Sequence, residues 1–208
     1  MLFLKNFNII SCSPETLILK KNNLIKTKPI AGTLRKTKNT NQKKALTFFR
    51  KNEKETKEHN MIVDMERNDL AKICKTGSVK IEKLKTVEEY RDLFHYVTTI
   101  KGILKNKITN HEIISSLMPG GSVIGCPKIS TIQLLNKKEK YDRNIYTGSF
   151  GIIHANGDMR FNIMIRTLLN FKNKIDLSVA SGVILGSTAK KEYNENYIKA
   201  KSLLELFN

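Results

Sequence analysis

The chain has 208 residues, of which 40% are hydrophobic, so it can bury a sizeable core, and general disorder is disfavoured. No apolar run reaches the ~18 residues of a membrane-spanning helix, so no membrane partner is expected. The formal net charge of +18 suits nucleic acid, but the basic residues are mostly dispersed lysines without interleaved aromatic residues, which favours a solvated surface over nucleic-acid binding.

The cysteines indicate a reducing compartment, and we expect the cytoplasm. Cys12, Cys74 and Cys126 are isolated and form no CxxC pair, so the sequence predicts neither a disulfide framework nor a zinc site. Residues 1–11 are apolar but contain a lysine and lack a small-residue cleavage site, which indicates a strand and not a signal peptide.

The first half of the chain combines strands with one long helical segment. Residues 28–36 are expected to be a loop or the end of a strand, and the periodicity of residues 41–74 predicts a helix. Alternating or continuous apolar residues predict strands at 1–11, 16–20, 77–84 and 93–104.

The second half adds short helices, a hairpin and a C-terminal helix. Residues 110–118 and 127–139 are predicted short helices, the second opened by a proline. Residues 146–169 are predicted to form a hairpin that turns at Asn156-Gly157. A further strand is expected at 174–185 and an amphipathic helix at 189–207. The predicted fold class is α+β with a largely antiparallel sheet, in one domain spanning residues 1–208.

Two pairs of glutamates share the same spacing in this basic chain. Glu55 and Glu58 are three residues apart, as are Glu192 and Glu195, so each pair lies on one face of a helix. Two facing carboxylate edges could bind a hard cation such as Mg²⁺. The alternative is solvated surface glutamate paired with nearby lysines, and spacing alone does not exclude it.

Basic and glycine-rich segments accompany these carboxylates. Arg166 ends an apolar stretch, where a buried charge needs a partner. Residues 119–128 form a glycine-rich turn before a predicted helix, a suitable place for backbone N–H groups that bind an anion. Lys128 lies in that first turn, and Lys199 lies one turn after Glu195. Each feature also has an ordinary reading as a turn or a solvated lysine.

A series of motifs resembles the chorismate-binding enzymes, the family of anthranilate synthase component I, aminodeoxychorismate synthase component I, isochorismate synthase and salicylate synthase. The motifs are SPE (13–15), PIAGT (29–33), EHNMIVDMERNDL (58–70), GSVKIEKL (77–84), FHYVTTI (94–100), PGGSVIGCPK (119–128), YTGSFG (146–151), IRTLL (165–169) and EYNENYIKAK (192–201). The resemblance covers nearly the whole chain in order, and it implies an antiparallel sheet flanked by helices.

The resemblance also implies a magnesium site that holds a carboxylate of chorismate. Glu58 and Glu195 would be direct ligands of Mg²⁺, while Glu55 and Glu192 would act directly or through water. Magnesium would then serve as a template and a charge clamp.

The remaining implied roles concern substrate and proton transfer. The implied substrate-binding residues are Thr33, Ser122, Tyr146, Arg166, Gly182 and Lys199. The implied catalytic residues are Glu15, His95 and Lys128. His95 would lie beside the reacting ring, although a histidine in an apolar strand is also an ordinary core residue. Glu15 would protonate the departing C4 hydroxyl, so burial and nearby negative charge should raise its pKa.

Residues 119–128 and 161–169 resemble aminodeoxychorismate synthase component I more than its relatives. Against this, Ala31 stands where many of those enzymes carry a lysine that attacks the ring, and it permits direct attack by ammonia instead. No Cys-His-Glu glutaminase signature is present, which implies a separate glutamine amidotransferase subunit as the ammonia source. Anthranilate synthase component I, or an inactive fragment of either enzyme, is the alternative.

Family members are about twice as long as this chain. We therefore expect a domain truncated at its N-terminus, without the upstream position that acts as general base in the isochorismate and salicylate enzymes. Chemistry that adds water to chorismate is disfavoured on that ground.

Overall fold

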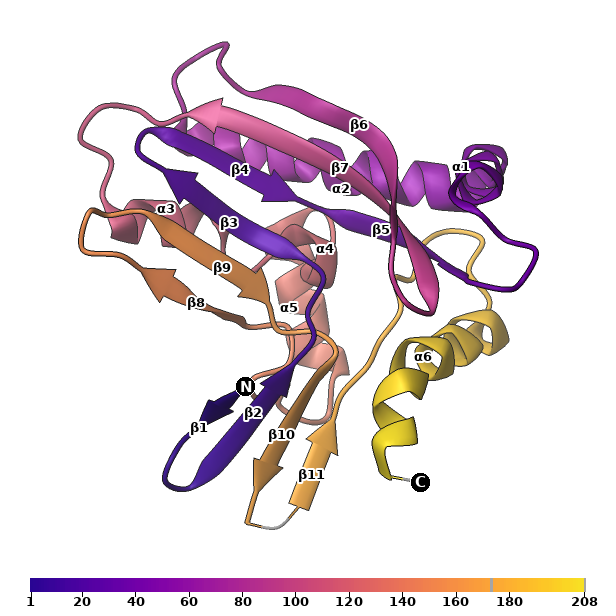
Figure 1. Cartoon of the computed structure of the whole chain (residues 1–208). Helices are drawn as coiled ribbons and strands as arrows, with labels where there is room; N and C mark the ends of the chain where they lie inside the picture. Colours follow the sequence, from indigo (N-terminus) through magenta and orange to yellow (C-terminus); the bar gives the residue numbers. More distant parts are fainter. Residues whose placement is uncertain (173, 208) are drawn as a thin grey trace.

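The computed structural model describes residues 1–172 and 174–207, which form antiparallel sheets flanked by helices (Figure 1). This confirms the predicted fold class. The strands are β1 (Leu2–Phe3), β2 (Phe7–Ser11), β3 (Thr16–Lys21), β4 (Leu24–Lys28), β5 (Ile30–Arg35), β6 (Lys80–Glu89), β7 (Leu93–Ile103), β8 (Ser149–Ile153), β9 (Met159–Ile163), β10 (Thr167–Phe171) and β11 (Lys174–Leu177).

The larger sheet has seven strands and is organised around β7. β4 and β5 pair with consecutive stretches of β7, and β6 pairs with the same residues of β7 from its other edge. β4 continues through β3 and β9 to β8 at the far edge. The segment expected to be a loop or strand end at 28–36 is therefore mostly strand, because β5 extends the pairing along β7.

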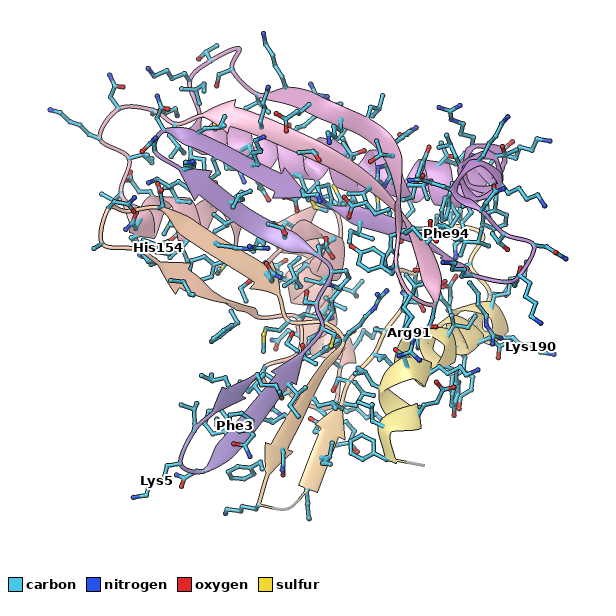
Figure 2. All side chains as sticks on the ribbon, in the orientation of Figure 1. Phe3, Lys5, Arg91, Phe94, His154 and Lys190 are labelled. Carbon is cyan, nitrogen blue, oxygen red and sulfur yellow. The ribbon has the colours of Figure 1, made fainter. Side chains whose placement is uncertain are left out.

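The smaller sheet has the strand order β1-β2-β10-β11. In Figure 2 its outer end carries Phe3 and Lys5, and the β8–β9 turn of the larger sheet carries His154. The predicted hairpin is confirmed for β8 and β9, but β10 belongs to the smaller sheet. Arg166 does not end a continuous strand: it lies between β9 and β10 with a φ of 50°, and this turn sends the chain from one sheet to the other.

Polar side-chain caps begin the first three helices. The helices are α1 (Gln42–Lys51), α2 (Glu53–Ile73), α3 (Asn110–Leu117), α4 (Gly121–Ile124), α5 (Lys128–Lys138) and α6 (Ala189–Leu204), followed by a 3-10 turn (Glu205–Phe207). The single helix predicted over 41–74 is wrong, because Asn52 adopts an extended conformation and its side chain accepts a hydrogen bond from the Glu55 amide, ending α1 and capping α2.

Two further boundaries differ from the prediction. The strand expected at 174–185 ends at Leu177, because the chain leaves the edge of the small sheet and runs to α6 without strand pairing. The glycine-rich turn at 119–128 contains the short helix α4.

The main core lies between the larger sheet and α2, which crosses behind that sheet in Figure 1. Ile18, Ile25 and Ile100 from the sheet pack with Leu70 and Ile73 from α2. A second cluster, built on Phe49 and Tyr96, packs α1 against β7. Within the described residues, no helix combines the length and apolarity needed to cross a membrane.

Candidate active site

The SPE segment places Glu15 in the interior, just before β3. Its side chain is only 4% exposed, so it is not a solvated surface glutamate. Burial raises the pKa of Glu15 to about 7, the Ser122 hydroxyl lowers it, and the Glu66 carboxyl raises it. Ser122 Oγ is buried and has no hydrogen-bond partner among the described residues. Ser122 and Glu15 are therefore close to each other but not hydrogen-bonded.

The raised pKa of Glu15 makes a testable contribution to stability. The folded chain holds this proton more tightly than the unfolded chain, so wild-type stability is lost as pH rises from 4.5 to about 7. Glu15→Gln removes the ionisation, so its free energy of unfolding should gain about 3 kcal/mol relative to wild type between pH 5 and pH 8. Urea unfolding at both pH values measures this.

Comparing the two proteins cancels the contributions of the buried histidines, which are the same in each. Glu53→Gln, at an exposed carboxylate of α2, should show no pH-dependent difference. If the difference in free energy of unfolding between Glu15→Gln and wild type is the same at pH 5 and pH 8, Glu15 ionises normally in the folded state.

His95 and Arg166 form a hydrogen-bonded pair near Glu15. Arg166 Nη2 donates to His95 Nε2 at 2.6 Å, so that nitrogen carries no proton. His95 Nδ1–H donates to the Gly32 carbonyl oxygen at 3.1 Å, which fixes the neutral tautomer. Burial and the Arg166 charge lower the pKa of His95 to about 3. His95 therefore orients the guanidinium and is not a proton donor in this arrangement.

Arg166 reaches this position because of its backbone. The left-handed turn between β9 and β10 directs its side chain toward β7 and away from either sheet edge. Its charge also lowers the pKa of Glu15, which places both groups in one electrostatic environment. Thr33 pairs with His95 across β5 and β7 and lies 3.4 Å from His95 Nδ1.

The four glutamates of the two ExxE pairs converge from α2 and α6. Burial, then Glu195, raises the pKa of Glu55. Burial, then Glu55, raises the pKa of Glu58 to about 7, and Glu195 raises it further. Carboxylates that act on one another in this way lie close together. These four are grouped and at least partly buried, and Glu192 and Glu195 also pair with lysines, as the alternative reading expects.

Two lysines neutralise part of this carboxylate group. Lys54 forms an ion pair with Glu192, and Lys199 pairs with Glu195 at 2.8 Å. Burial raises the pKa of Glu192, but hydrogen bonds and charges, first that of Lys54, outweigh burial, so the pKa is lowered. Within residues 1–172 and 174–207, no three His, Cys, Asp or Glu side chains are gathered closely enough to form a metal centre as they stand.

The segment before α6 connects the carboxylates to the other candidates. A Cβ at Gly182 would collide with Glu58 Oε1, so this backbone packs directly on the carboxyl. Lys199 Nζ donates to the Ala180 carbonyl at 3.1 Å. Burial raises the pKa of the Tyr146 hydroxyl, and the nearby Ala180 backbone amide acts in the opposite direction. Tyr146, Gly182 and Lys199 therefore lie along one segment.

The acid and carboxylate groups belong to a single region. A Cβ at Gly32 would lie 2.7 Å from Glu55 Oε2, and the Gly32 carbonyl accepts the His95 hydrogen bond. The Lys199 charge contributes to the lowered pKa of His95, after burial and Arg166. The turn between β6 and β7, marked by Arg91 in Figure 2, points toward α6.

Lys128 is largely shielded from solvent and paired with a carboxylate of α2. Its Nζ lies 2.5 Å from Asp69 Oδ2, and Asp69 is itself buried. Lys128 is therefore not a solvated lysine, and its partner is a carboxylate of α2.

Sequence reasoning missed Lys54, Glu66, Asp69 and Tyr90. Lys54 lacked a signal, since many lysines surround it. A sequence signal did exist for Glu66 and Asp69. They lie between Ile62 and Ile73 at helical spacing, which places them on the buried face of α2. Tyr90 packs edge-on against His95 with ring centroids 5.3 Å apart.

Comparison of the whole chain with known proteins identifies its family. Residues 1–205 match the chorismate binding enzyme family. The chain is 38% identical over 198 residues to an anthranilate synthase component I-like protein of Synechocystis, covering 95% of this chain and 41% of that protein. It is 38% identical over 196 residues to aminodeoxychorismate synthase component 1 of Bacillus subtilis, covering 94% and 42%.

A solved structure has the same fold. Anthranilate synthase component I from Streptococcus pneumoniae superposes with a TM-score of 0.85 at 35% identity, covering 95% of this chain and 44% of that one. The chain thus spans about two fifths of the length of the curated relatives described above. With a family match over nearly its whole length, the chain belongs to the chorismate binding enzymes.

Proposed function

We propose that this chain binds chorismate with Mg²⁺ and carries the catalytic residues for its amination by ammonia, giving 4-amino-4-deoxychorismate. The observation that carries the proposal is the meeting of a buried acid, Glu15, and a guanidinium, Arg166, with the carboxylates of both ExxE pairs in one region. Family membership supports chorismate as the substrate class.

Cationic and polar groups would bind the two carboxylates of chorismate. Arg166 is oriented by His95 and has donors left beyond that bond. Lys199 and Tyr146 lie beside the backbone of residues 180–182 and would bind the second carboxylate of chorismate. Ser122 and Thr33 would contact the ring substituents, and Lys128 would fix the glycine-rich loop through Asp69.

The residues present suit a hard divalent cation. Carboxylate oxygens are the ligands that Mg²⁺ prefers. Glu192 Oε2 is buried and has no hydrogen-bond partner among the described residues, so it can accept a cation. Glu58 and Glu195 would be the direct ligands, with Glu55 and Glu192 acting directly or through water. The bound ion would supply a charge clamp for a substrate carboxylate.

Lys54 should compete with Mg²⁺, because it is paired with Glu192 and its pKa is raised by Glu192, Glu195 and Glu58 against the effect of burial. Lys54→Met removes a positive charge from the site. We expect its Mg²⁺ affinity, measured by calorimetry, to rise about tenfold or more, since ~1.4 kcal/mol of relieved repulsion gives a factor of ten.

The matched control is Lys57→Met, which removes the same charge one turn away on the exposed face of α2, where Lys57 pairs with Glu53. Its Mg²⁺ affinity should equal that of wild type. An unchanged or lower affinity in Lys54→Met would show that Lys54 does not compete for the ion.

Glu15 would supply the proton for the reaction. For 4-amino-4-deoxychorismate, a bond from ammonia to ring carbon C4 replaces the bond from C4 to its hydroxyl. The hydroxyl leaves as water with the Glu15 proton, which leaves an ammonium on C4 and a carboxylate at Glu15. A pKa of about 7 leaves a large protonated fraction near neutral pH. Ala31 is buried on β5 and offers no nucleophile, so ammonia itself attacks.

Anthranilate formation is the second candidate, because relatives with both names show the same 38% identity. In either case we propose that a separate glutamine amidotransferase subunit delivers the ammonia. The test incubates the chain with chorismate, ammonium and Mg²⁺ and identifies the product by chromatography and mass spectrometry. 4-Amino-4-deoxychorismate supports the proposal, anthranilate supports the second candidate, and unchanged chorismate contradicts both for this chain alone.

A further inference from the structure

Glu66 is a buried carboxyl for which packing offers no reason. Its side chain is 2% exposed, on the face of α2 that carries Val63, Leu70 and Ile73. An apolar residue there would extend the core, whereas a carboxyl must be desolvated. Among the described residues Glu66 has no ion pair, and Lys128, whose charge lowers its pKa, pairs with Asp69 instead.

Groups from two different elements approach Glu66. Thr27 Oγ1 on β4 donates to Glu66 Oε2 at 2.8 Å. Gly121, at the start of α4, packs against Met65, the residue before Glu66 in α2, and its amide lowers the pKa of the Glu66 carboxyl. Glu66 therefore lies where the larger sheet and the glycine-rich segment meet α2. The residue after Gly121 is Ser122, whose buried hydroxyl faces Glu15.

We propose that Glu66 is a positioning residue for Glu15: its carboxyl holds the 119–125 segment through the Gly121 amide, and its charge keeps the Glu15 proton in place. This inference rests on the proposed function only for the use of that proton. The contacts and the charge coupling belong to the chain without substrate.

The charges around both carboxyls agree with a coupled pair. Burial raises the pKa of each to about 7, and the Glu66 charge contributes to the value of Glu15. Asp69 raises the pKa of Glu66, and Lys128 lowers it. Arg166 lowers the pKa of Glu15. When two carboxyls repel each other, the pair loses its protons in two separate steps that cannot be assigned to either residue alone. The pair therefore keeps one proton at pH values at which two isolated carboxyls would have lost both.

The experiment follows the side-chain carboxyl of Glu15 by NMR in the chain labelled with ¹³C-glutamate, over pH 4 to 9, without chorismate or Mg²⁺. Glu66→Gln keeps an oxygen that accepts hydrogen bonds but removes the charge. We expect the Glu15 midpoint to fall by roughly half a unit to one unit and its curve to become a single step. Asp64→Asn removes an exposed carboxylate of the same helix and should leave the curve unchanged.

A second variant separates the two parts of the role. Glu66→Ala removes both charge and acceptor, so hydrogen exchange at the Gly121 amide should become faster, while Glu66→Gln should retain most of the protection. If the Glu15 curve in Glu66→Gln matches wild type, the inference is wrong, and Glu66 serves only the packing of the segment. If the titration behaves as expected but the chain consumes no chorismate, the proposed function fails and the coupling stands.

Discussion

Glu15→Gln is expected to lower chorismate turnover by about 10²–10⁴-fold, the range that a positioned general acid contributes. Hydroxide is a poor leaving group, and glutamine cannot donate the proton that turns it into water. Chorismate affinity and Mg²⁺ dependence should stay near wild type, because neither uses this carboxyl. The measurement is steady-state chorismate consumption in the preparation in which wild type is active.

Glu53→Gln is the control for this variant, because its carboxylate is exposed at the start of α2 and pairs only with Lys57. It should keep wild-type turnover. Near-normal turnover in Glu15→Gln would remove Glu15 from the mechanism and leave the acid unassigned. The burial of Glu15 would then be a structural feature alone.

Glu195→Gln is expected to weaken Mg²⁺ binding by about 100-fold or more, since outer-shell changes alone cost roughly 10–100-fold at metal sites. The substitution removes a direct ligand and frees Lys199, which then adds an unpaired positive charge to the site. Calorimetric titration of Mg²⁺ into the chain measures the effect without any turnover.

The control on the same C-terminal segment is Glu205→Gln, at a half-exposed carboxylate that pairs with Lys201. Its Mg²⁺ affinity should not change. Equal Mg²⁺ affinity in Glu195→Gln and wild type would exclude Glu195 as a ligand and would leave the ion to Glu55, Glu58 and Glu192.

Local patterns in the sequence were sufficient for most elements of the fold. A mostly apolar run marked β7, and Asn156-Gly157 marked the β8–β9 turn. The patterns failed where tertiary context decides. A single capping residue, Asn52, divides α1 from α2, and the positive φ of Arg166 moves the chain between sheets. Neither event interrupts the apolar periodicity that the sequence displays.

The candidate site was predictable as a set of residues but not as a set of charge states. The motifs identified Glu15 and the ExxE pairs, and chemistry required a raised pKa for Glu15. Its burial depends on the packing of distant segments, which no local pattern records. The pairing of Lys54 with Glu192 joins residues 138 positions apart, so only the folded chain reveals it.

The most direct test of the account is a calorimetric titration of chorismate into the chain with Mg²⁺ present, repeated with the metal removed by EDTA. The account predicts saturable binding of one chorismate per chain that requires Mg²⁺ and is lost in Arg166→Met. Binding that is equally strong in EDTA, or no binding with Mg²⁺ present, would contradict it.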